Sequence, residues 1–175
     1  MNRSNSNKIG ILGGSFDPPH KGHIKISIES KKKFKLDKII WAITKKNPFK
    51  SKSNLNLKDR IILSKKIIQK YPFIKVQFFE KKIQSNRTIN LINYLIRKNK
   101  NTSLYLIMGA DNLINFHKWV KWEQIARKCR ILVFDRTGFK TKSINSFSYK
   151  KLRKKGLKFI KFKKVNISSS KLRKI

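Results

Sequence analysis

The sequence has few of the features that mark secreted and membrane proteins. Cys129 is the only cysteine among 175 residues, so no disulfide can form within the chain and a reducing compartment is expected. No apolar run approaches the roughly 18 residues that a membrane-spanning helix requires. The basic start of the chain is followed by a short apolar run that Gly13 and Gly14 interrupt, so we expect no signal peptide. These absences favour a cytoplasmic protein without a membrane partner.

Acidic residues are also scarce. The chain has 8 Asp and Glu against 45 Lys and Arg, a formal charge of +37, and such a charge favours contact with the phosphates of nucleic acids. However, the lysines are spread from Lys8 to Lys174 and outnumber the arginines, whereas specific readers of bases rely on the bidentate arginine fork. We therefore expect weak, salt-sensitive adhesion to nucleic acid and no specific nucleic-acid partner.

Hydrophobic residues make up 39% of the chain, which is enough for a folded core, and the length fits a single domain over residues 1–175. Apolar patterns predict strands at 8–14, 37–43, 73–79, 103–108, 130–135 and 157–162. They predict helices at 21–34, 56–70, 88–98, from after "GADN" (109–112) through 128, near 146–155 and from about 167. Strands that alternate with helices indicate an α/β fold with a Rossmann-like, doubly wound, mostly parallel sheet. Ligands bind such sheets at the carboxyl ends of the strands.

The stretch "ILGGSFDPPHKGHI" (11–24) follows the first predicted strand. Gly13 and Gly14 let a ligand approach the backbone, and Asp17 could accept hydrogen bonds from backbone donors in its own proline-stiffened turn. His20 and His23 would share one face at the start of a helix whose free N–H groups form an anion site. Two imidazole donors there suit a polyphosphate. A metal pair with Asp17 as third ligand and purely structural histidines are the alternatives.

"GGSFDPPHKGH" resembles the signature of the nucleotidyltransferase superfamily that carries a His-x-Gly-His box. Within it, the chain resembles the bacterial nicotinate-nucleotide adenylyltransferase family along nearly its full length. The further segments that carry this resemblance are "NPFK" (47–50), "DRIILSKKI" (59–67), "RTINLINYL" (87–95), "LIMGADNLINFHKWVKWEQI" (106–125) and "ISSSKLR" (167–173). The chain departs from the family where "NPFK" replaces the usual Pro-Pro-His-Lys and where Ser170 replaces a threonine.

The resemblance implies transfer of AMP from ATP to nicotinate mononucleotide, which yields deamido-NAD and pyrophosphate in NAD biosynthesis. The phosphate of the acceptor is the nucleophile, so the protein has to align the reactants and neutralise charge rather than supply a general base. His20, His23 and Arg173 are the catalytic residues that the resemblance implies. Magnesium would arrive with ATP, bound to phosphate oxygens and water rather than to a metal site of the protein.

The resemblance also implies two sets of binding residues. Those for ATP are Gly13, Gly14, Ser15, Phe16, His20, His23, Gly109, Asp111, Ser169, Ser170 and Arg173. Those for nicotinate mononucleotide are Thr88, Trp119, Val120, Asn47 and Lys50. Asp111 would accept from the ribose hydroxyls or cap a helix, and Trp119 would stack on the pyridine ring or belong to the core. Arg60 and Arg136 could contact phosphate or be structural, and His117 is expected at the surface.

Three other functions remain open at this point. The acceptor could be nicotinamide mononucleotide instead of the acid. Phosphopantetheine adenylyltransferase shares the fold and a Ser-Ser motif near its end, but it has threonine where His20 stands and lacks the Trp119–Trp122 segment. A basic nucleic-acid-binding protein could have kept an old enzyme fold, although the presence of His20, His23 and Arg173 argues against this.

Overall fold

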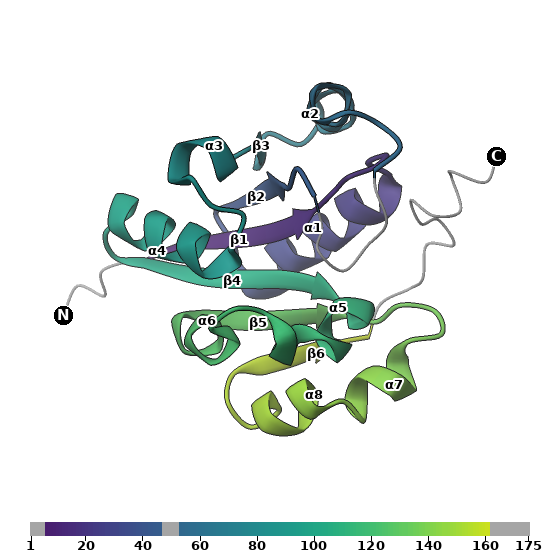
Figure 1. Ribbon diagram of the computed structural model, residues 1–175, viewed down its shortest axis with the longest axis vertical. Helices are drawn as coiled ribbons and strands as arrows, with labels where there is room; N and C mark the ends of the chain where they lie inside the picture. Colours follow the sequence, from purple (N-terminus) through teal and green to yellow (C-terminus); the bar gives the residue numbers. More distant parts are fainter. Residues whose placement is uncertain (1–5, 47–52, 162–175) are drawn as a thin grey trace.

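The computed structural model describes residues 6–46 and 53–161 (Figure 1). In this part of the chain six strands form one sheet in the order β3-β2-β1-β4-β5-β6, and every neighbouring pair is parallel. The strands are β1 (Asn7–Gly14), β2 (Lys38–Ile43), β3 (Ile74–Gln77), β4 (Thr102–Gly109), β5 (Cys129–Phe134) and β6 (Leu157–Ile160). The direction of the strand order changes between β1 and β4. The predicted doubly wound α/β sheet is confirmed.

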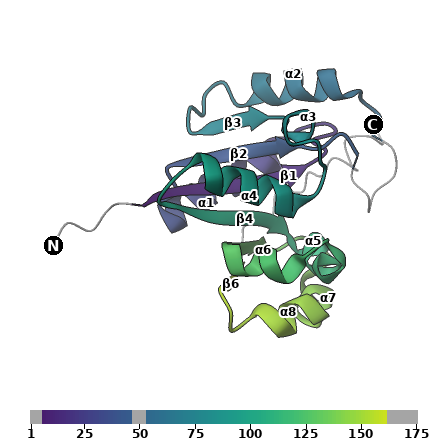
Figure 2. The same cartoon turned by 60° about the vertical axis from the view of Figure 1, so that its left-hand side comes forward.

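Helices cover both faces of the sheet, and Figure 2 shows α4, α5 and α6 in front of the strands with α1 behind them. The helices are α1 (Lys21–Phe34), α2 (Leu57–Ile67), α3 (Glu80–Ile83), α4 (Thr88–Lys98), α5 (Ala110–Ile114), α6 (Trp122–Lys128), α7 (Lys140–Ile144) and α8 (Phe147–Leu152). One buried cluster joins Ile24 of α1 to Trp41 of β2. A second joins Ile92 of α4 and Ile125 of α6 to Leu106 of β4. No helix among the described residues is long and apolar enough to cross a membrane.

The strand predictions are accurate, and some helix predictions are wrong. Each predicted strand is present, with ends that differ by at most two residues. The single helical stretch expected over 113–128 is instead divided among the end of α5, the 3₁₀ helix η1 (Phe116–Lys118) and α6, because Phe116 turns into the core and Lys121 takes a left-handed conformation (φ 54°). His117 is half-buried, and its backbone N–H donates to Ser148 Oγ at 3.0 Å, so it is not an ordinary surface residue. The helix expected from about 167 lies outside the described residues.

Candidate active site

The residues that the sequence singles out gather where β1 and β4 end, beside the change in strand order (Figure 1). Gly13 and Gly14 are the last two residues of β1, and Gly109 is the last residue of β4. His20 immediately precedes α1, and Asp111 lies in α5. Parallel sheets bind their ligands at this edge. The topology therefore brings together groups that are almost 100 residues apart in the sequence.

His20 and His23 form a reciprocal cap at the start of α1. His20 Nδ1 accepts from the Gly22 N–H at 3.1 Å, and His23 Nδ1 accepts from the His20 N–H at 3.2 Å. A neutral imidazole carries one N–H, so this network assigns the proton of each ring to Nε2. The two ring centroids lie 3.9 Å apart. The cap therefore orients two imidazoles that each have an Nε2–H donor.

This cap corrects the expected anion site. The free backbone N–H groups predicted at the start of α1 are partly occupied, because those of His20 and Gly22 donate to the imidazoles. The His23 N–H donates to the carbonyl oxygen of His20 at 2.9 Å. Binding of an anion at this helix start would therefore rest on side-chain donors rather than on these backbone groups.

Buried aromatic rings support His23. Phe16 has a left-handed backbone (φ 50°), and its ring stacks on Trp41 with a centroid distance of 4.9 Å and lies 4.7 Å from the His23 ring. The Trp41 indole N–H donates to Ser27 Oγ, which in turn donates to the carbonyl oxygen of His23. Because Phe16 as a whole residue is only 2% exposed, it offers almost no surface for direct contact with ATP.

Asp111 and Arg136 form an ion pair beside the histidines. Arg136 donates to Asp111 Oδ2, whereas the buried Oδ1 has no hydrogen-bond partner in residues 6–46 and 53–161. A Cβ at position 109 would lie 2.5 Å from that same Oδ1, so Gly109 makes room for the carboxylate. Burial lowers the pKa of His20 to about 4, and the positive charge of Arg136 contributes in the same direction. His20 is therefore neutral near pH 7.

Replacing Arg136 by glutamine should raise the pKa of His20, because one of the two influences that lower it is removed. Burial remains, so the pKa should stay below 6.5. NMR titration can measure this directly, since the chain has only 3 histidines. An unchanged His20 pKa in this variant would contradict the electrostatic link.

In the wild type, the unfolded chain binds more protons than the native protein between pH 6.5 and about 4, so stability should fall as the pH drops through that window.

Asp17 is buried and binds the backbone of the segment before α2, a contact that its own turn did not indicate. It is 2% exposed, and its two oxygens accept from the Asn54 N–H at 2.8 Å and the Leu55 N–H at 3.0 Å, in the segment before α2. The metal alternative would require Asp17 beside the histidines. Among the described residues, no three His, Cys, Asp or Glu side chains are grouped so that they could hold a metal ion.

Two of the residues expected to bind the acceptor, Thr88 and Trp119, lie on the α4 face of the sheet. Thr88 is the first residue of α4, a helix start without a side-chain cap and without an acidic residue in its first turn. Trp119 is half-buried, packs edge-on against Phe116 at 5.2 Å, and accepts from the Trp122 N–H through its carbonyl oxygen. Val120 is 45% exposed. The remaining expected site residues, Asn47, Lys50, Ser169, Ser170 and Arg173, lie outside the described residues.

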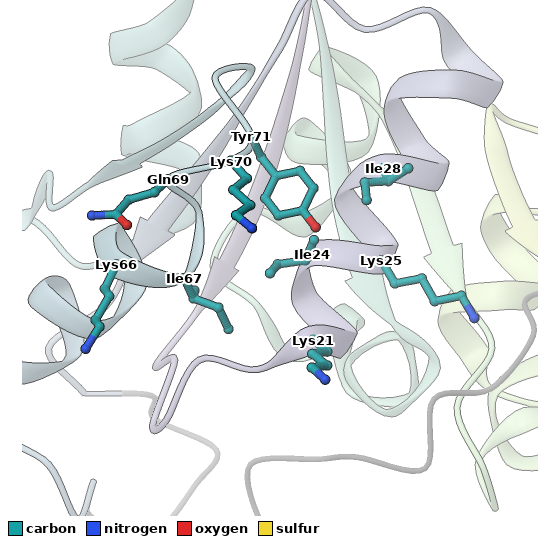
Figure 3. A pocket seen from close by; sticks show the side chains of 9 residues that line it. All are labelled: Lys21, Ile24, Lys25, Ile28, Lys66, Ile67, Gln69, Lys70 and Tyr71. Atoms are coloured by element: carbon teal, nitrogen blue, oxygen red, sulfur yellow. The ribbon is translucent and has the colours of Figure 1, made fainter.

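A pocket of about 540 Å³ lies between α1 and α2 (Figure 3). Its walls combine apolar side chains with lysines. The lining residues are Lys21, Ile24, Lys25, Ile28, Lys66, Ile67, Gln69, Lys70 and Tyr71. Neither His20 nor His23 lines this pocket, so it is separate from the candidate site. Lysines around an apolar floor are expected in a chain with this composition and do not by themselves define a ligand.

The comparisons with known proteins agree with this geometry. Residues 11–175 match the family model described as cytidylyltransferase-like. The chain belongs to the cytidylyltransferase-like family. The matched range contains the histidine cap, the Asp111–Arg136 pair, Thr88 and Trp119.

The two relatives and the solved structure described next are all named for the same enzyme activity. A protein of Pelagibacter ubique (strain HTCC1062) named "Probable nicotinate-nucleotide adenylyltransferase" is 62% identical over 168 residues, covering 96% of this chain and 93% of that protein. One of the same name from Agrobacterium fabrum is 41% identical over 131 residues, covering 74% and 70%. The fold is similar to Plasmodium falciparum nicotinic acid mononucleotide adenylyltransferase complexed with NaAD, with a TM-score of 0.78 at 22% identity, covering 96% of this chain and 83% of that one.

Proposed function

We propose that this enzyme transfers AMP from ATP to nicotinate mononucleotide and releases deamido-NAD and pyrophosphate. The observation that carries the proposal is the pair of oriented imidazole donors at the change in strand order. This pair occurs in a chain that is 62% identical to a relative named for the same activity. The enzyme class follows from the relatives, and the geometry of the site supports the residue roles proposed below.

The reaction joins two phosphates. An oxygen of the acceptor's phosphate attacks the α-phosphorus of ATP, and the bond from that phosphorus to the oxygen shared with the β-phosphate breaks. The Nε2–H groups of His20 and His23 donate to the phosphoryl oxygens and stabilise charge as it moves toward pyrophosphate. Arg173, Ser169 and Ser170 bind the outer phosphates in this scheme. Mg²⁺ that arrives with ATP would screen the phosphate charges.

The nucleosides bind on either side of this centre. Asp111 accepts from the ribose hydroxyls of ATP, and Arg136, which donates to its Oδ2, holds the carboxylate in place. On the α4 face, Trp119 stacks on the pyridine ring. Its carboxylate accepts from Thr88 and from backbone N–H groups near Val120, while Asn47 and Lys50 contact the acceptor's phosphate. The uncapped start of α4 favours an anion there.

The test of the activity is pyrophosphate release by the purified full chain. ATP with nicotinate mononucleotide should release pyrophosphate, and ATP alone should release almost none, because the acceptor supplies the nucleophile. Added deamido-NAD and pyrophosphate should regenerate ATP. Release that does not depend on any acceptor would indicate a hydrolase and would overturn the proposal.

We place the enzyme in the cytoplasm. Its single cysteine, Cys129, is buried, and burial raises the pKa of the thiol to about 12. A buried protonated thiol is a poor nucleophile and a poor partner for disulfide exchange. The cysteine content therefore fits a reducing compartment, where no covalent cross-link is available to stabilise the fold.

A further inference from the structure

Arg60 of α2 is a buried cation, and every side-chain hydrogen bond that it makes within residues 6–46 and 53–161 goes to a backbone oxygen. It is 2% exposed, and its guanidinium donates to four carbonyl groups. The distances are 2.7 Å to Ser15, 2.8 Å to Thr44, 3.1 Å to Lys45 and 3.2 Å to Leu55. These oxygens belong to three segments, which follow β1, follow β2 and precede α2. A guanidinium out of water is tolerated only when its donors are satisfied, and here all three nitrogens donate.

Two carboxylates accept hydrogen bonds from backbone N–H groups in two of the same segments, the one after β2 and the one before α2. Asp17 accepts from the backbone N–H groups of Asn54 and Leu55. Glu80 accepts from the Lys45 N–H at 3.1 Å and from the Thr44 hydroxyl. Burial lowers the pKa of Arg60, and the negative charges of Asp17 and Glu80 oppose that change. The segments are therefore held through both their carbonyl and their N–H groups.

One of these segments leads directly to a histidine of the site. Ser15, whose carbonyl oxygen Arg60 binds, precedes Phe16. Phe16 has the left-handed backbone conformation that residues with a side chain seldom adopt, and its ring lies 4.7 Å from that of His23. A shift of the Ser15 carbonyl would therefore move Phe16, and Phe16 would move or release His23.

We propose that Arg60 is a positioning residue for phosphoryl transfer, which acts through Ser15 and Phe16 on the His23 imidazole. The proposal rests on the adenylyl-transfer activity proposed above. Arg60 touches no substrate in this account, and it fixes the loop from which His23 is supported. Lysine at this position keeps the positive charge but cannot donate to three segments at once, because it lacks the planar fork.

The experiment measures Arg60→Lys, His23→Asn and the double variant. Arg60→Lys should lower kcat about 10- to 100-fold, because even a small displacement of a catalytic group from its productive position slows the reaction. KM should change less than threefold. Because the effect passes through His23, the double variant should be little slower than His23→Asn alone. Arg97→Lys, an exposed arginine in the last turn of α4, is the matched control and should retain wild-type rates.

A second readout does not depend on activity. NMR of the histidine side chains should show a shifted His23 signal in Arg60→Lys, because the Phe16 ring moves relative to it, and an unchanged His117 signal. If Arg60→Lys does not fold, Asp17→Asn weakens the same loop and should give the same two results. Wild-type kcat in the variant, or multiplicative losses in the double variant with an unmoved His23 signal, would overturn the proposal. An inactive wild type would instead refute the proposed function, and the His23 signal would still decide the role of Arg60.

Discussion

Replacing His20 by asparagine should lower kcat about 10²–10³-fold, the usual loss when one donor to a transition state is removed. Asparagine is a favoured helix N-cap, so its side chain can still accept from the Gly22 N–H that His20 Nδ1 binds. What disappears is the Nε2–H donor. Steady-state pyrophosphate release measures kcat, and thermal unfolding should show that the protein remains folded. The same loss is expected for His23→Asn.

Two further variants separate the donor from the cap. His20→Ala removes both, so it should lose the same activity and also about 1 kcal/mol of stability. His117→Gln changes the one histidine outside the site and should retain activity within about twofold. A His20→Asn enzyme with kcat within threefold of wild type would contradict the role of the imidazole.

Nicotinate mononucleotide should be used with a kcat/KM about 10- to 10⁴-fold higher than its amide. In the proposed function the donors near the ring are Thr88 and backbone N–H groups at Val120, which would match a carboxylate. An amide would turn its own N–H₂ toward donors, which leaves buried polar groups unpaired at about 1–3 kcal/mol each. The basic surroundings of the site should add a smaller preference for the acid that weakens as salt rises.

Trp119→Ala separates stacking from recognition of the carboxylate. Because stacking does not depend on the carboxylate, this variant should lose efficiency with both acceptors to a similar degree and keep their ratio. Kinetics with each acceptor over a range of salt concentrations provides the measurement. Equal efficiency of the wild type with the two acceptors would refute the assignment of the acid. If the ratio of the two kcat/KM values instead fell to about one in Trp119→Ala, the indole itself would discriminate between acid and amide.

The sheet could be predicted from the sequence because parallel strands buried on both faces appear as short apolar runs, as in 103–108. The break in the helix predicted over 113–128 could not be predicted in this way. It depends on the burial of Phe116 and on the left-handed Lys121, and neither changes the local apolar pattern. Helices α3 and α7 have 4 and 5 residues, too few for a helical period to emerge.

The histidine pair could also be predicted, because its members are close in the sequence and share the start of one helix. The Arg60 contact with Ser15 spans 45 positions, and the Arg136–Asp111 pair spans 25, so sequence spacing carries no information about either. One signal was present for Arg136. It follows β5 by two residues, at the sheet edge where the neighbouring strand β4 ends at Gly109. A charged residue just after a buried parallel strand is therefore a candidate site residue even where no motif contains it.

The central claim is tested most directly by competition among acceptors. The full-length protein is incubated with ATP, Mg²⁺ and an equimolar mixture of nicotinate mononucleotide, nicotinamide mononucleotide and phosphopantetheine, and the early products are identified by mass spectrometry. We expect deamido-NAD to dominate, with pyrophosphate in equal amount. A product mixture dominated by NAD or by dephospho-coenzyme A, or the absence of any adenylylated product, would contradict the account.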